Sequence, residues 1–100
     1  MTVAADPEGV SARTIQEFVD LEGRRILEIG CGKGRLTFPL AEIANHITAI
    51  DPGAEDIQQA VEATPDHLKG KIDFISKGIE KFEPQDSAPL FDLSIFTWSL

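Results

Sequence analysis

Short apolar runs alternate along the chain with stretches whose apolar residues recur at helical spacing. The apolar runs, each predicted to be a strand, cover residues 25–29, 46–51, 71–76 and 91–96. A helix is predicted after the first strand, since Leu36, Leu40 and Ile43 fall on one face. Another is predicted from about Ala54 to near Pro65. The first strand is apolar on both faces apart from one carboxylate, as in a central parallel strand. The pattern therefore predicts an α/β fold.

The first residues depart from this pattern. Residues 1–10 are polar and contain the turn-prone letters DPEG, so we expect a flexible N-terminal lead. A helix is predicted after it, with Ser11 as its N-cap and Gly23 just past its end. The apolar face of this helix would consist of Ile15, Phe18 and Val19.

A glycine turn between a strand and a helix, in the stretch ILEIGCGKGRLTFPLA, carries the candidate chemistry. Its glycines are Gly30, Gly32 and Gly34. Glycine accepts positive φ at no cost, and its missing Cβ lets a ligand lie directly on the backbone. The first amides of the helix also point at whatever lies there. This arrangement predicts a nucleotide-type binding unit, but not a dinucleotide loop, because Arg35 stands where G-x-G-x-x-G requires its third glycine.

The register of the glycines, together with Glu28 two residues before Gly30, gives E-x-G-x-G-x-G. This pattern resembles the first motif of the class I S-adenosylmethionine-dependent methyltransferases, and the resemblance extends from about Arg25 to Leu100. It implies a Rossmann-like, doubly wound and mostly parallel sheet, with strand order 3-2-1-4. It also implies S-adenosyl-L-methionine as cofactor and transfer of its sulfonium methyl to an acceptor. Residues 11–100 would form the N-terminal part of the domain, because no helix follows the last strand.

The ends of the first two strands supply most of the contacts that the resemblance implies. Glu28 would face the methionine end of the cofactor, and a structural pairing with loop amides, Arg25 or Lys33 is compatible with that role. The loop itself would contribute Gly30, Cys31, Gly32 and Gly34, and Pro52 would contribute beside Asp51. Asp51 would bind both ribose hydroxyls through charge-assisted hydrogen bonds. Alternatively, Asp51 only begins the turn at Pro52-Gly53.

The remaining implied contacts lie farther along the chain. Ile57 would pack against the adenine, although core packing explains it equally well. After the third strand this sequence has Gly78 where the family usually has an acid, with Glu80 two residues on. The Ile79 amide would then read the adenine, because Gly78 permits an unusual turn. The residues expected to flank the sulfonium and the substrate are Thr97, Trp98 and Ser99. Trp98 would form a cation–π wall, or else cover the sheet edge.

Composition limits the partners. The chain has 17 acidic and 9 basic residues and a net charge of −8, which argues against a nucleic-acid-binding surface. No apolar run approaches the roughly 20 residues of a membrane span, and no signal peptide is recognisable. With a single cysteine, Cys31, the chain forms no internal disulfide, and we expect a cytoplasmic protein. His46 and His67 lack ligand spacing, so no metal site is predicted.

Three functions are therefore weighed. The first is methyl transfer to an acceptor, expected to be a small molecule. The second is a nicotinamide- or flavin-dependent oxidoreductase, and the third is a non-catalytic cofactor-binding fragment. The chain alone is expected to be inactive as an enzyme. It is also expected to self-associate, because an isolated half-sheet exposes its fourth strand as an apolar edge.

Overall fold

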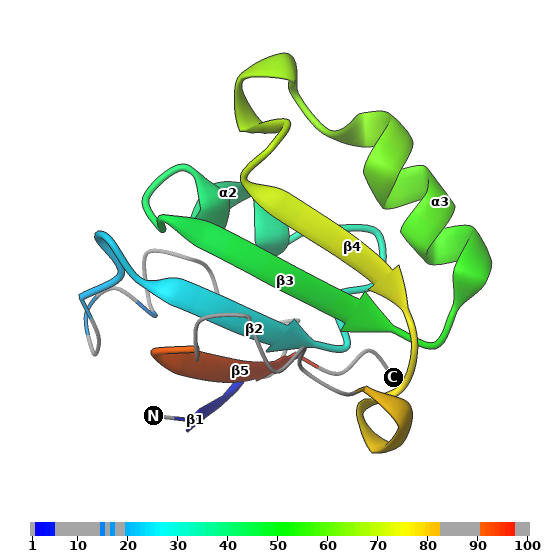
Figure 1. Cartoon of the computed structure of the whole chain (residues 1–100), viewed down its shortest axis with the longest axis horizontal. Coiled ribbons are helices and arrows are strands. Elements are labelled where there is room, and N and C mark those ends of the chain that lie inside the picture. The colour runs from blue at the N-terminus through cyan, green and yellow to red at the C-terminus, as the bar shows by residue number, and fades with distance from the viewer. Residues whose placement is uncertain (1, 6–14, 16, 18–19, 83–90, 98–100) are drawn as a thin grey trace.

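The computed structural model describes residues 2–5, 15, 17, 20–82 and 91–97. Within them, five parallel strands form one sheet in the order β1-β5-β2-β3-β4 (Figure 1). Their bounds are Thr2–Ala5 for β1, Arg25–Ile29 for β2, His46–Asp51 for β3, Ile72–Ser76 for β4 and Leu93–Thr97 for β5. The four predicted strands are confirmed in the predicted order, third, second, first and fourth.

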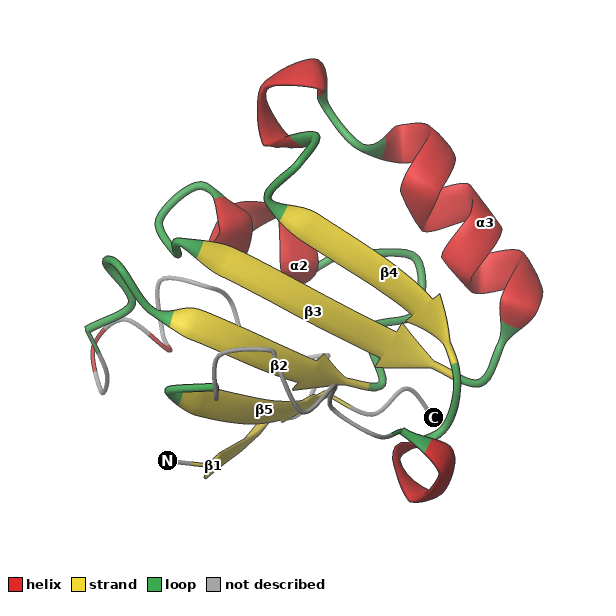
Figure 2. Ribbon diagram, viewed as in Figure 1, coloured by secondary structure: helices red, strands yellow, loops and turns green. Residues whose placement is uncertain are grey.

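Among the described residues, helices α2 and α3 cover the sheet (Figure 2). Helix α2, Thr37–Ala41, packs on β3, and helix α3, Ala54–Ala63, packs on β3 and β4. Two short 3₁₀ helices, η1 at Asp66–Leu68 and η2 at Ile79–Lys81, come before and after β4. The core lies between the sheet and both helices, and its members include Ile26, Leu40, Ile47 and Ile57.

Helix α2 is shorter than the stretch from Leu36 to Ile43, whose apolar spacing predicted a helix. It ends at Ala41, after which the chain turns back toward β3, and the Asn45 and His46 amides both donate to the Arg24 carbonyl. Helix α3 ends as predicted, because the residue before Pro65 is disfavoured in helical conformation and Thr64 is extended.

The N-terminal segment corrects two expectations. Thr2–Ala5 is not part of a flexible lead but forms β1, which pairs in parallel with β5 and places Val3 beside Ile95. Strand β5 therefore lies between β1 and β2 and is not the exposed edge from which self-association was predicted. The sequence could not show this pairing, since the partner strand lies at the other end of the chain.

The predicted helix from Ser11 is described only in part. Ile15 and Glu17 are helical and Ile15 is buried, whereas Ser11, Phe18 and Val19 lie outside the described residues. Within the part of the chain that the structure describes, no helix has the length and apolar content needed to cross a membrane.

Deletion of residues 1–5 tests the pairing of β1. Removing β1 exposes the backbone groups on the outer edge of β5, which then become available to a second chain. We expect the melting temperature to fall by about 5 °C, as a loss of about 1 kcal/mol would cause in a domain of this size. The mean mass in light scattering should rise. The full chain at the same concentration is the control, and an unchanged mass and melting temperature would contradict the pairing.

Candidate functional site

The carboxyl ends of four parallel strands meet at one rim of the sheet (Figure 1). The register pairs Ile29 with both Ile50 and Phe96, and it pairs Asp51 with Ser76. The glycine loop after β2, Asp51 at the end of β3, and the turn after β4 are thereby placed at the same rim. Thr97 ends β5 there, while Trp98 and Ser99 lie outside the described residues.

The glycine loop is attached to the end of β3 by backbone hydrogen bonds. The amides of Gly30 and Cys31 both donate to the Ile50 carbonyl, at 2.8 and 3.1 Å. The three glycines all have positive φ, at 86° for Gly30, 56° for Gly32 and 91° for Gly34. L-residues with a side chain rarely adopt this region, so the loop conformation depends on glycine as predicted.

Two of the glycines serve different purposes. A Cβ added to Gly32 would meet no atom within 4 Å, so the space above this part of the loop is open. A Cβ added to Gly34 would lie 2.9 Å from the Phe38 ring, so glycine is required there for packing. Phe38 in turn makes an edge-on contact with Phe74 of β4. The opening needed for a ligand therefore lies at Gly32.

Asp51 joins the loop to the start of α3. One oxygen, Oδ2, accepts a hydrogen bond from the Gly32 amide at 3.0 Å, and the other, Oδ1, accepts one from the Gly53 amide at 2.8 Å. The turn-forming role considered for Asp51 is therefore present. Each carboxylate oxygen offers two lone-pair sites, so a half-buried Asp51 retains capacity for two further donors.

Glu28 has a structural partner. Its side chain is fully buried, and the Thr37 hydroxyl, also fully buried, donates a hydrogen bond to Glu28 Oε1. The protein itself thus holds this carboxylate, and its predicted contact to the methionine end of the cofactor stays a prediction. Sequence reasoning did not single out Thr37; the signal available was a hydroxyl at the start of the helix that follows the glycine loop.

The turn after β4 differs from the prediction. Gly78 has φ −77° and ψ 161°, an ordinary extended conformation, so the unusual turn expected there is wrong. The Glu80 side chain folds over this position, with its carboxylate oxygens 2.6 and 2.8 Å from where a Cβ would stand. The exposed Glu80 carboxylate thus lies directly beside Gly78. The neighbouring Ile79 side chain is 43% exposed, at the same rim.

Ile57 and Cys31 are both buried near the loop. Ile57 belongs to the hydrophobic core, which fits its packing role. Burial, together with the negative charges of Glu28 and Asp51, raises the pKa of the Cys31 thiol. The thiol therefore stays neutral and is not an activated nucleophile. Among the described residues, no three His, Cys, Asp or Glu side chains gather so that they could hold a metal ion.

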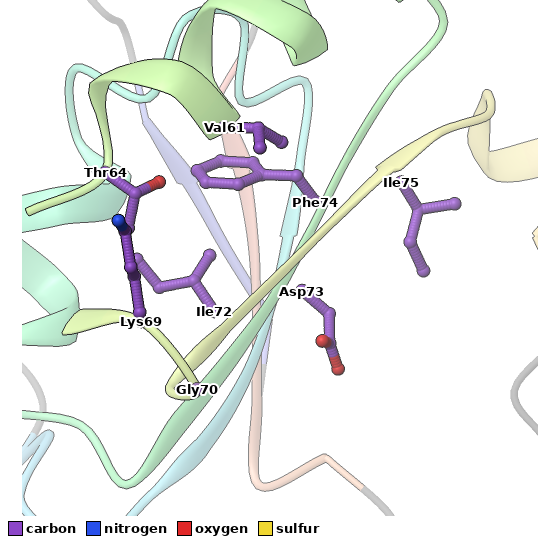
Figure 3. A pocket seen from close by; sticks show the side chains of 8 residues that line it. All are labelled: Val61, Thr64, Lys69, Gly70, Ile72, Asp73, Phe74 and Ile75. Atoms are coloured by element: carbon purple, nitrogen blue, oxygen red, sulfur yellow. The ribbon is translucent and has the colours of Figure 1, made fainter. Parts of the chain in front are cut away.

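A cavity of about 430 Å³ lies elsewhere, beside the outer edge of β4 (Figure 3). Val61 of α3 and Phe74 of β4 lie together on one side of it, and Lys69 lies near the start of the strand (Figure 3). None of the predicted site residues lines this cavity. The rim at the carboxyl ends of the strands therefore remains the candidate site.

Residues 26–99 match the family model described as a methyltransferase domain. The chain belongs to the class I S-adenosylmethionine-dependent methyltransferases. Their Rossmann-like fold agrees with the observed strand order, and the match decides between the two cofactor classes that were weighed.

Two curated methyltransferases and one solved structure illustrate the similarity. A ubiquinone biosynthesis O-methyltransferase of Maricaulis maris is 40% identical over 73 residues, which cover 72% of this chain and 28% of the relative. The 23S rRNA (uracil(1939)-C(5))-methyltransferase RlmD of Methylococcus capsulatus is 36% identical over 59 residues, 59% of this chain and 13% of the relative. An S-adenosylmethionine-dependent methyltransferase structure from Mesorhizobium loti has a TM-score of 0.69 and 26% identity, over 89% of this chain and 40% of that one. The chain thus spans less than a third of either curated relative.

Substitution of Gly34 by alanine tests the packing of the methyltransferase loop, with Gly70→Ala as the matched control. Both glycines have φ near +90°, but a Cβ at Gly70 meets no atom within 4 Å. We expect Gly70→Ala to lower the free energy of unfolding by about 1 kcal/mol from strain alone. Gly34→Ala should cost at least about 1 kcal/mol more, because its Cβ collides with Phe38. Urea unfolding measures both, and equal losses would contradict the assigned packing.

Proposed function

We propose that this chain forms the cofactor-binding part of an S-adenosylmethionine-dependent methyltransferase, with the cofactor at the rim described above. The observation that supports this most strongly is the link between two strand ends, in which the Gly32 amide donates to Asp51 Oδ2 at 3.0 Å. This link places a carboxylate with spare acceptor capacity beside a stretch of backbone with open space above it.

The residues at the rim fit the parts of the cofactor. Asp51 would accept hydrogen bonds from the ribose hydroxyls. The exposed Ile79 side chain offers apolar surface for the adenine, and the Glu80 carboxylate would accept a hydrogen bond from its amino group. Thr97, which ends β5, and Trp98, which follows it in sequence, would lie toward the sulfonium.

The electrostatics of the loop also suit this ligand. After burial, the negative charges of Glu28, Asp51 and Asp56 also raise the pKa of Cys31, and carboxylates so close to the loop favour a negative potential there. Such a potential favours a cation, and the bound cofactor supplies a positively charged sulfonium that carries an activated methyl group. The chain's own residues then have to bind, orient and exclude water rather than act as nucleophiles.

The proposal for the methyl acceptor names only its chemical class. We propose a small molecule, on the ground that a net charge of −8 disfavours a nucleic-acid partner. One related enzyme is named for ubiquinone biosynthesis and the other for a uracil of 23S rRNA. Family membership therefore does not identify the acceptor. We propose a cytoplasmic location from the composition. The chain alone is expected to be inactive, since it spans less than a third of either curated relative.

Calorimetric titration with S-adenosylhomocysteine tests the ribose site. Asp51→Asn removes the charge and replaces one acceptor oxygen by an amide, so we expect binding to weaken at least about tenfold, equivalent to about 1.4 kcal/mol. Asp56→Asn is the matched control, because its carboxylate also lies close to Gly53 but is not proposed to touch the ribose. NAD serves as the control ligand. Preferential binding of NAD, or equal effects of both substitutions, would contradict the assignment.

A second titration tests the adenine contact of Glu80. S-inosylhomocysteine lacks the exocyclic amino group, so the wild-type chain should bind it at least about tenfold more weakly than S-adenosylhomocysteine, a difference of about 1.4 kcal/mol. Glu80→Ala should abolish this preference, whereas Glu62→Gln, which changes an exposed carboxylate of α3, should preserve it. If Glu80→Ala retains the full preference, another group receives the amino group.

A further inference from the structure

One buried polar contact joins the two elements that flank the glycine loop. Glu28 lies on β2, before the loop, and Thr37 begins α2, after it. Both side chains are fully buried, and the Thr37 hydroxyl donates to Glu28 Oε1. A carboxylate removed from water costs free energy unless hydrogen bonds compensate for its lost hydration. Loss of this hydrogen bond would therefore destabilise the fold.

Helix α2 has little else in its own sequence to fix where it starts. It has only five residues, and helices of this length do not form alone in water. Its N-cap position is held by Leu36, which makes no side-chain cap hydrogen bond, and its first turn has no acidic residue. Beside the ring contact of Phe38 with Phe74 of β4, the Thr37 hydroxyl ties the first turn of α2 to the sheet, at Glu28 of β2.

The loop between these elements needs such a tie. Its glycines have the widest backbone freedom of any residue, so the loop holds its shape only if both ends are fixed. The first end is fixed by the Ile50 carbonyl, which accepts from the Gly30 and Cys31 amides. At the second end, the Phe38 amide donates to the Gly34 carbonyl, so a shift of α2 moves Gly34 with it.

We propose that Thr37 is a positioning residue of the cofactor site: through its hydrogen bond to Glu28 it fixes the start of α2 and thereby the conformation of the glycine loop. Thr37 touches no ligand in this role. Glu28 then acts as the anchor of the loop, and Asp51 and Glu80 provide the acidic contacts to the ligand. The cofactor part of this inference rests on the proposed function, while the effect on the loop does not.

Hydrogen–deuterium exchange of the ligand-free chain tests the effect on the loop. Thr37→Val keeps the shape of the side chain and removes the hydroxyl. We expect exchange at the Gly32 and Gly34 amides to accelerate at least tenfold, while amides of β3, such as that of Ile47, change less than threefold. Thr48→Val is the matched control, because it removes a hydroxyl from a threonine that is 8% exposed and lies on β3. It should leave the loop glycines within threefold of wild type.

Thr37→Ser provides the rescue. It restores the hydroxyl without the methyl group, so exchange at Gly32 and Gly34 should return to within fivefold of wild type. If Thr37→Val does not fold, Thr37→Ala, which also lacks the hydroxyl, takes its place, and its acceleration must be confined to the loop. Equal acceleration of loop and strands in the folded variant, or no acceleration of the loop, would overturn the proposal.

The affinity for S-adenosylhomocysteine gives the second readout. Thr37→Val should weaken binding at least tenfold, Thr37→Ser should recover most of it, and Thr48→Val should bind within twofold of wild type. If the wild-type chain does not bind, the proposed function fails and the exchange result still decides the role of Thr37. If the wild-type chain and Thr37→Val bind equally well, the positioning role fails while the proposed function stands.

Discussion

The end of β3 holds the glycine loop, and the rest of the site depends on this contact. The Ile50 carbonyl accepts two loop amides and the Asp51 carboxylate accepts a third, so consecutive residues of one strand fix the backbone that follows another. These contacts form only because β2 and β3 are parallel and in a register that pairs Ile29 with Ile50. A shift of one residue would turn Asp51 to the other face of the sheet and release the loop. The strand register is therefore itself a determinant of the geometry of the candidate site.

The sequence predicted the elements whose signal is local. The strands at Arg25–Ile29 and His46–Asp51 have the predicted bounds, because a buried parallel strand appears as a continuous apolar run. Strand β1 was missed, because four residues have no periodicity to detect and their partner, β5, lies at the other end of the chain. Helix α2 was predicted too long, since apolar spacing continues past Ala41 although the backbone has already turned toward β3.

The features of the candidate site that depend only on residue type and spacing in the sequence were predictable. The positive φ values of the loop glycines and the position of Asp51 at a strand end both follow from the motif. The partner of Glu28 does not, because Thr37 meets it only once α2 has packed on the sheet. The turn at Gly78 was also misjudged: glycine was taken to signal an unusual backbone, whereas the structure shows ordinary backbone and a side chain, Glu80, folded over it. Glycine indicates either backbone freedom or crowding, and sequence alone does not separate the two.

Three carboxylates near the carboxyl ends of these strands differ in how deeply they are buried. Glu28 is fully buried, Asp51 is half-buried and Glu80 is exposed. A fully buried carboxylate must be satisfied by the protein itself, since a ligand that comes and goes would leave it without hydration or partners. A half-buried one can hold the loop with part of its hydrogen-bonding capacity and keep the rest for a ligand. An exposed carboxylate gives up only its bound water when a ligand binds. The order of burial therefore predicts the order of function, from anchoring the loop, through joining loop and ligand, to recognising the ligand.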